Sequence, residues 1–274
     1  MIFYVILIIC IIIWLNFGRS LESVQYYHNK LLQNFDWSEL EGLRYCIYSS
    51  ILYSGSYLST TEKIFKIHGP NYTRQIQPVG VIIRKENYLA IAIKSTANLN
   101  DVLVSIDHQL VDIPEGQIHK GYYKNAIEIL PYILDIIRYF PEKELFLTGH
   151  SMGGSLVSIM GYLIHKFIKG YKIRIETYGS PKYGNIQLKG FMEKILDITN
   201  YINDADLVVK KPIDKRYVRI GKVVKHRVDT GNDNVNHGIK VYRECVLKVK
   251  ESNIPKRGHR FDEIVSRFVF DILG

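Results

Sequence analysis

The sequence predicts an open α/β fold in which helices cover both faces of a mostly parallel sheet. Short apolar runs of strand length alternate along the chain with longer segments whose apolar residues recur at three- and four-residue steps. One such run, Leu145–Leu147, leads into Gly149-His150-Ser151-Met152-Gly153 and then into a stretch rich in small residues. The chain has 274 residues, of which 47% are hydrophobic and 23% charged, which suits a single globular domain with a substantial core.

The expected elements follow in chain order. The runs with strand character are 64–67, 79–83, 89–93, 145–147, 173–178 and 197–202. The segments with helical spacing are 21–34, 37–54, 126–139 and 261–273. Pro131 predicts a kink or a restart in the third of these helices. The segments Tyr217–Ile220 and Val223–Val228, with Gly221 between them, are typical of a hairpin.

Residues 1–20 differ from the rest of the chain. The unbroken apolar run Ile2–Leu15 has fourteen residues, which is more typical of a signal peptide than of a full membrane span, for which about 20 are needed. An uncleaved membrane anchor is the alternative. We therefore expect residues 21–274 to form the folded domain and to be secreted or anchored. In an oxidising compartment Cys46 and Cys245 form an even number of cysteines, and Asn71 lies in the sequon Asn-Tyr-Thr as a candidate glycosylation site.

The net charge of +9 is concentrated near the C-terminus. Residues 210–260 contain fifteen Lys or Arg against five Asp or Glu. A solvated basic face explains this, and attraction to an anionic lipid surface is the second interpretation. Nucleic acid is disfavoured because the segment contains no recognisable binding module. The sequence shows no Cys/His ligand spacing and no phosphate-binding loop, so we expect neither a metal nor a cofactor, and the oligomeric state stays open.

The segment around Ser151 fits the pattern G-x-S-x-G of a nucleophile elbow, a sharp strand-to-helix turn that exposes a strained serine. Glycine at 149 and 153 is expected because neighbouring chains pass too closely for a side chain. Such a serine needs a base, and an acid to orient the base, later in the chain. Asp206, which follows the strand at 197–202, and His237, in the loop 229–238, have the required order.

Chain order alone does not distinguish Asp206 from Asp204. Two further histidines are better explained as structural residues. His150 adjoins the serine but its backbone position points it away from the hydroxyl, and His226 falls within an expected strand.

Taken together, the motifs of residues 75–245 resemble those of the class 3 lipases, the fungal-lipase-like family of α/β-hydrolases. The landmarks are Ile118-His-Lys-Gly121, the elbow, the segment from Thr177 to Asn185, Asp206-Leu-Val, and the segment from Asn236 to Tyr242. The family pattern places its acid immediately before a Leu/Ile-Val pair. The resemblance therefore selects Asp206 over Asp204.

The resemblance implies an α/β-hydrolase fold and hydrolysis of a lipid carboxylic ester by Ser151, Asp206 and His237 through an acyl-enzyme. Triacylglycerol lipase is the first expectation, phospholipase A1 the second and a short-chain esterase the third. An alternative of another class is a catalytically silent, secreted or anchored lipid-binding protein, although such a protein does not require all three residues. The backbone amides of Met152 and Thr96 are expected to form the oxyanion hole, with Ser95 where the family usually has glycine.

Two further expectations depend on the resemblance. The first is a disulfide between Cys46 and Cys245, because related lipases often tie their N-terminal helix to the C-terminal region. The second is a mobile lid at residues 97–108, where Leu99, Val102, Leu103 and Ile106 share one face of a helical pattern. A fixed helix whose apolar side belongs to the core has the same periodicity.

Overall fold

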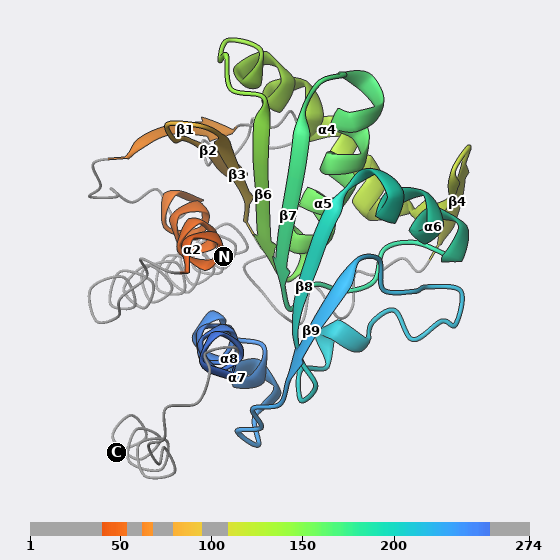
Figure 1. Cartoon of the computed structure of the whole chain (residues 1–274). Helices are drawn as coiled ribbons and strands as arrows, with labels where there is room; N and C mark the ends of the chain where they lie inside the picture. Colours follow the sequence, from red (N-terminus) through yellow and green to blue (C-terminus); the bar gives the residue numbers. More distant parts are fainter. Residues whose placement is uncertain (1–39, 54–61, 68–78, 95–108, 253–274) are drawn as a thin grey trace, which may run out of the picture.

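The computed structural model describes residues 40–53, 62–67, 79–94 and 109–252 (Figure 1). Its centre is a seven-stranded sheet with the strand order β1-β2-β3-β6-β7-β8-β9. The strands are β1 Lys63–Ile67, β2 Gly80–Arg84, β3 Leu89–Ile93, β6 Glu144–His150, β7 Lys172–Tyr178, β8 Asp197–Asn203 and β9 Lys222–His226. Strands β1, β2 and β3 pair antiparallel, whereas β3, β6, β7, β8 and β9 pair parallel. The mostly parallel sheet predicted from the sequence is confirmed.

Helices cover both faces of this sheet, as predicted (Figure 1). One face carries α4 Lys120–Ile137, α5 Met152–Phe167 and α6 Ile186–Ile195, and the other carries α2 Glu41–Tyr53 and α8 Ile239–Ser252. Two short helices, η2 Val208–Lys210 and α7 Asp233–Asn236, lie in loops after β8 and β9. A separate hairpin is formed by β4 Leu110–Ile113 and β5 Gly116–His119.

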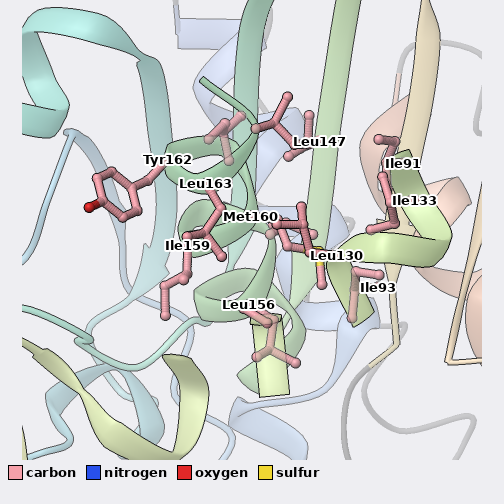
Figure 2. Packing of buried hydrophobic residues seen from close by; sticks show 14 of the residues in the cluster. Ile91, Ile93, Leu130, Ile133, Leu147, Leu156, Ile159, Met160, Tyr162 and Leu163 are labelled. Atoms are coloured by element: carbon pink, nitrogen blue, oxygen red, sulfur yellow. The ribbon is translucent and has the colours of Figure 1, made fainter. Parts of the chain in front are cut away.

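The larger core lies between the sheet and the pair α4 and α5 (Figure 2). Helix α5 is buried around most of its circumference, because α4 packs on one side and β6 and β7 on the other. This burial explains its small residues. A Cβ at Gly161, for example, would lie 2.6 Å from the Ile175 side chain. Burial of each large apolar side chain in this layer contributes about 1.5–3 kcal/mol, so α5 is held firmly at the centre of the sheet.

The hairpin predicted for residues 217–228 is wrong. Tyr217–Ile220 is not a strand in the structure, and Val218 forms only an isolated bridge with Gly184. Strand β9 instead pairs parallel with β8. The Asn200 side chain explains the bend, because its Nδ2 donates to the carbonyl oxygens of Ile220 at 2.8 Å and Lys222 at 3.2 Å. The chain turns there at Gly221, whose φ of 94° is in the left-handed region.

Other differences concern helix boundaries and missed elements. Helix α4 begins six residues earlier than the expected 126 and continues through Pro131, so a restart at that proline is wrong. The start is explained by His119, whose Nδ1 accepts a hydrogen bond from the Tyr122 amide as a helix cap. The sequence analysis did not predict β4, β5, α6 or α8.

Several predictions fall outside the described residues. They concern the N-terminal segment 1–20, the helices at 21–34 and 261–273, the sequon at Asn71, the oxyanion residue Thr96 and the lid at 97–108. The division into residues 1–20 and 21–274 likewise stays a prediction. Among the helices that the structure describes, none combines the length and the apolar character needed to cross a membrane.

The predicted disulfide between Cys46 and Cys245 is wrong, because the structure does not join these two buried side chains. Cys46 lies on α2, where its Sγ is 3.6 Å from the Thr148 hydroxyl of β6. Cys245 lies on α8, which packs on β8 and β9. Strands β6 and β8 are separated by β7, so the two helices cover different parts of the sheet. Neighbouring strands are about 4.8 Å apart, whereas a disulfide needs Cα atoms within about 7 Å.

We predict that both thiols resist alkylation in the folded protein and react after unfolding without any reductant. Burial raises the pKa of Cys46 and of Cys245 to about 12, and the thiolate is the reactive form. Iodoacetamide treatment at pH 8 with and without guanidinium, followed by peptide mass mapping, measures this. A sample unfolded with reductant is the control. Alkylation of these peptides only when reductant is present would show that the two cysteines form a disulfide.

Candidate active site

Ser151 occupies the sharp turn between β6 and α5. Its φ of 57° makes it the one residue other than glycine with a positive φ in the described part of the chain. The conformation is held by the Ser151 amide, which donates to the Tyr178 carbonyl oxygen of β7 at 2.9 Å. A Cβ at Gly149 would lie 2.3 Å from the Gly153 backbone, and one at Gly153 would lie 2.4 Å from the Ile93 carbonyl oxygen. Both glycines are therefore required by the close approach of backbone to backbone, as expected.

The Ser151 hydroxyl is not used for structure. Ser151 stands at the N-cap of α5, where a serine side chain usually accepts a hydrogen bond from the helix, but it makes no such bond. Its Oγ is buried and has no hydrogen-bond partner within the described part of the chain. By contrast, the hydroxyl of Ser180 contacts Thr177 Oγ1 at 3.0 Å and accepts from Arg219 at 3.1 Å. Of these two serines, Ser151 has the hydroxyl that is free to react.

Asp206 lies beyond the end of β8 and is fully buried. Its Oδ1 accepts a hydrogen bond from the Val208 amide at 2.8 Å, and its Oδ2 lies 2.7 Å from His237 Nδ1. Asp204, the alternative acid, is partly exposed and faces Lys225 Nζ at 3.7 Å. The structure therefore brings Asp206, and not Asp204, to the histidine.

His237 follows α7 and is almost completely buried. Because an ionised carboxylate can only accept, Nδ1 of the imidazole carries the hydrogen in the contact with Asp206. In the neutral ring Nε2 is then an acceptor, and this atom is buried without a partner among the described residues. The site thus presents a free hydroxyl on Ser151 and a free basic nitrogen on His237.

His150 contacts the segment of His237, and His226 is a half-exposed residue of a strand, as the sequence interpretation expected. The His150 ring lies 4.7 Å from the His237 ring, and its Nε2 is 2.8 Å from the His237 carbonyl oxygen. His150 therefore supports the loop that carries His237. His226 closes β9, and burial lowers its pKa, as does the nearby Lys248.

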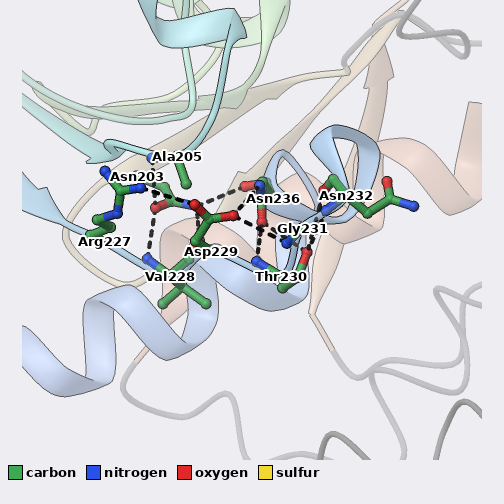
Figure 3. Close-up of polar contacts among 9 residues, drawn as sticks. All are labelled: Asn203, Ala205, Arg227, Val228, Asp229, Thr230, Gly231, Asn232 and Asn236. Carbon is green, nitrogen blue, oxygen red and sulfur yellow. Dashed lines mark hydrogen bonds and ion pairs between the residues drawn. The ribbon is translucent and has the colours of Figure 1, made fainter.

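Asn203, the last residue of β8, joins the loops that carry the acid and the histidine (Figure 3). Its Oδ1 accepts from the amides of Ala205 at 3.3 Å and Val228 at 2.9 Å. Its Nδ2 donates to the carbonyl oxygens of Val228 at 2.8 Å and Asn236 at 3.1 Å. The side chain is fully buried with all four of its hydrogen bonds made.

The loop between β9 and His237 is held by its own polar side chains (Figure 3). Asn236 Oδ1 accepts from the amide and the hydroxyl of Thr230, both at 2.8 Å. Asp229 accepts from the Gly231 amide at 3.1 Å and from Arg227 at 2.9 Å. Asn232 caps the short helix α7 by accepting from the amides of Asn234 and Val235. These contacts fix the backbone immediately before His237.

The half-buried Arg219, which the sequence analysis missed, contacts the segments that follow β7 and β8. Arg219 donates to the carbonyl oxygens of Ser180 at 2.6 Å and Val209 at 2.5 Å. Burial lowers the pKa of Arg219, and the charge of Asp206 acts in the opposite direction. The sequence held no signal for this residue, because Arg219 is one of fifteen basic residues between 210 and 260.

The oxyanion hole can be described in part. Met152 is the first residue of α5, so its amide belongs to the helical turn whose N–H groups have no intrahelical acceptor. Thr96 lies outside the described residues. Lys94, two residues before Thr96, is half-buried, and this burial lowers its pKa to about 7. No cluster of His, Cys, Asp or Glu suited to a metal ion occurs in the segments that the structure covers.

We predict that Asn203→Ala destabilises the fold by about 2–4 kcal/mol, because four buried or partly buried backbone groups lose their partner at once. Guanidinium unfolding of both proteins measures the difference in free energy. Asn234→Ala, an exposed amide on the adjacent helix α7, is the matched control and is expected to stay within about 0.5 kcal/mol. Equal stability of Asn203→Ala and wild type would contradict the bridging role of this side chain.

Part of the chain is similar to known lipases. Residues 90–215 match the family model of lipase (class 3). A Saccharomyces cerevisiae protein named provisionally as the lipase LIH1 is 25% identical over 120 residues, which cover 42% of this chain and 34% of that protein. The chloroplastic phospholipase A1-Igamma1 of Arabidopsis thaliana is 34% identical over 79 residues, covering 26% of this chain and 15% of that protein. The matched segments thus span about a third or less of these curated relatives.

The solved structure of the triacylglyceride lipase of Rhizomucor miehei superimposes with a TM-score of 0.57 at 17% sequence identity. The superposition covers 72% of this chain and 83% of that chain, which establishes a common fold. The matched residues 90–215 include the elbow at Ser151 and the acid loop at Asp206. Residues 90–215 are therefore similar to the class 3 lipase family, and the chain has the α/β-hydrolase fold.

Proposed function

We propose that this protein is a serine hydrolase of lipid carboxylic esters, with Ser151 as nucleophile, His237 as general base and Asp206 as the acid that orients the base. The observation that carries the proposal is the buried pair of Asp206 Oδ2 and His237 Nδ1 at 2.7 Å, which leaves His237 Nε2 unpartnered among the described residues. Ser151 has a strained backbone and a hydroxyl without a partner among the described residues. It directly follows His150, whose ring contacts the His237 ring. Nucleophile, base and orienting acid are the groups that acyl transfer requires.

In the proposed reaction His237 Nε2 takes the hydroxyl proton as Ser151 Oγ forms a bond to the acyl carbon. The amide of Met152 donates to the developing oxyanion, and Asp206 stabilises the imidazolium. His237 then returns the proton to the departing alcohol oxygen, which leaves the acyl group on Ser151. In the second half of the cycle a water molecule gives a proton to His237 and its oxygen forms a bond to the acyl carbon. His237 then returns this proton to Ser151 Oγ as the bond between Oγ and the acyl carbon breaks, which releases the carboxylic acid and restores the Ser151 hydroxyl.

Ser151 and Asp206 are fully buried, so an acyl group cannot contact the hydroxyl in this conformation. Binding of substrate therefore requires a conformational change that opens the site. The proposed lid at residues 97–108, which lies outside the described residues, would provide one. Ser151 Oγ and His237 Nε2 form no hydrogen bond with each other in this conformation, and catalytic hydrogen bonds often form only once substrate is bound.

Two substrates follow within this activity. Triacylglycerol is the first that we propose, and a phospholipid acyl ester is the second. The phospholipid is kept as the second candidate because the loop after Asp206 carries the exposed basic residues Lys210, Lys215 and Arg216, whose charges attract a phosphate headgroup. A release assay that compares the two lipids with a short-chain ester ranks the candidates.

We predict that a fluorophosphonate probe labels the wild-type protein and that Ser151→Ala abolishes this labelling. Ester turnover in the same variant should fall by about a thousandfold or more, because the acyl-enzyme cannot form. Gel fluorescence with the probe and titration of released acid measure the two effects. A wild-type protein that is not labelled, although folded, would favour the catalytically silent lipid-binding protein.

The acid offers a matched pair of controls for this experiment. Asp206→Asn removes the charge that faces His237, whereas Asp204→Asn removes a charge that faces Lys225 at the surface. Only the first is expected to slow labelling strongly. The reverse ranking would transfer the role to Asp204.

We also propose that the loop 207–216 contacts an anionic lipid surface. Leu207 and Ile213 are exposed, with 72% of Ile213 accessible, and four basic residues accompany them against one acidic residue, Asp214. The loop follows the proposed acid directly, so it lies on the side of the sheet that carries the site. Apolar side chains beside basic ones suit the boundary between headgroups and acyl chains. Secretion or anchoring through residues 1–20 belongs to the same proposal.

We predict that the protein binds vesicles with phosphatidylglycerol at least tenfold more tightly than pure phosphatidylcholine vesicles, since each basic residue contributes about 1 kcal/mol near an anionic surface. Ile213→Asp should weaken the anionic binding by roughly tenfold through lost apolar contact and added repulsion. Vesicle co-sedimentation measures both. Ile127→Asp, at an exposed apolar position on α4, is the control. An equal loss in both variants would assign the binding to general surface properties.

A further inference from the structure

The acid of the site has a partner that the proposed mechanism does not use. Tyr242 of α8 is fully buried, and its hydroxyl donates to Asp206 Oδ2 at 2.6 Å. The amide of Asn203 donates to the same hydroxyl oxygen at 3.3 Å. Because an amide N–H can only donate, the hydroxyl hydrogen of Tyr242 is left for the carboxylate.

Tyr242 and His237 therefore share one acceptor atom. Asp206 Oδ2 accepts from His237 Nδ1 at 2.7 Å and from the phenol at 2.6 Å, while Oδ1 accepts from Val208. The three donors come from three different segments, namely η2, the end of α7 and α8. Together they fix both the rotation and the charge distribution of the carboxylate.

The ring of Tyr242 has a separate structural task. It packs against Gly179, where an added Cβ would lie 2.9 Å from two ring carbons and from the hydroxyl oxygen. It also lies edge-on to the His150 ring, with the centroids 5.7 Å apart. Phenylalanine would keep these contacts and remove only the hydroxyl, so the two tasks can be separated by a single substitution.

We propose that Tyr242 is a positioning residue that acts through Asp206 and sets how strongly this carboxylate stabilises the protonated form of His237. The inference rests on the proposed function, because it assigns Tyr242 to the support of Asp206 and His237 in that reaction. Two donors on one oxygen compete for its electron density, so the phenol weakens the hold of Asp206 on the imidazolium. A base that releases its proton more readily is active at lower pH.

The surrounding groups do not replace this contact. Burial holds the pKa of Tyr242 well above its ordinary value, and the charge of Asp206 acts in the same direction, so the phenol keeps its proton throughout the working range. The other titratable or charged groups that face the pair are Arg219, Cys245 and His150. Arg219 donates to carbonyl and hydroxyl oxygens, and burial raises the pKa of Cys245 to about 12. Arg219 and Cys245 therefore do not change charge near neutral pH. His150 Nε2 lies 2.8 Å from the carbonyl oxygen of His237.

The test is the pH profile of labelling by a fluorophosphonate probe, measured on the full chain for wild type and Tyr242→Phe. With the competing donor removed, the midpoint of the acid limb should move to higher pH by about 0.5–1 unit, a part of the effect of a hydrogen bond to a charged group, because Asp206 stays ionised on both sides of the midpoint. The plateau rate should fall by about three- to tenfold, because the carboxylate loses one of its three constraints. A fallen plateau with an unmoved midpoint would mean a merely structural tyrosine and would overturn the inference.

A second substitution guards against a variant that does not fold. Replacement of Tyr242 by 3-fluorotyrosine makes the phenol a stronger donor with little change in size, so the midpoint should move to lower pH. A shift of the same sign in both proteins would also overturn the inference.

Tyr45→Phe is the matched control, because its hydroxyl also donates to a carboxylate, Glu41 at 2.5 Å, but on helix α2. Its midpoint should equal that of wild type. If the wild-type protein is not labelled at all, the proposed function itself is contradicted. If Tyr242→Phe is labelled but its midpoint does not move, only the inference on Tyr242 is contradicted.

Discussion

Burial of the Asp206 carboxylate is the constraint on which the site depends. A buried charge costs several kcal/mol unless hydrogen bonds or an opposite charge compensate for it. Among the described residues no Lys or Arg forms an ion pair with Asp206, so hydrogen-bond donors perform this role. The Val208 amide, His237 and Tyr242 provide them, and each must be held where it can donate. The loops after β8 and β9 and the position of α8 follow from that requirement.

The parallel sheet explains why three distant residues can meet. Strands β6, β8 and β9 run in the same direction, so the segments that follow them emerge at one edge of the sheet. Ser151 follows β6, Asp206 follows β8, and His237 lies in the connection after β9. Asn203 then ties the last two of these connections together. A rigid sheet with short, internally bonded loops thus holds the polar groups in place before any substrate binds.

The prediction from sequence succeeded where the signal was local or carried by a family motif. The runs at 89–93 and 173–178 are strands because apolar, β-branched residues bounded by turns suit a buried parallel sheet. The glycines around Ser151 were predicted correctly for the reason that the structure gives. The hairpin at 217–228 failed because a strand-like run does not say which strand it pairs with, and the bend at Gly221 is held by Asn200 from another strand. Helices α6 and α8 were missed because their many polar residues leave no long apolar run, although their apolar residues recur at helical spacing.

The sequence by itself determined the order of the strands and helices around the elbow, the candidate serine, acid and histidine, and the family that they resemble. These features depend on residue type and spacing along the chain, which are local properties. Only the tertiary structure decided that the two cysteines lie over different strands. It also decided that Asp206 rather than Asp204 contacts His237. Finally, it placed Tyr242 in a hydrogen bond with Asp206 and Arg219 near the same carboxylate. The physical reason is that a hydrogen bond depends on a distance of about 3 Å and on direction. Between residues 31 or 36 positions apart, these are set by how β8, α7 and α8 pack and not by any pattern in the chain.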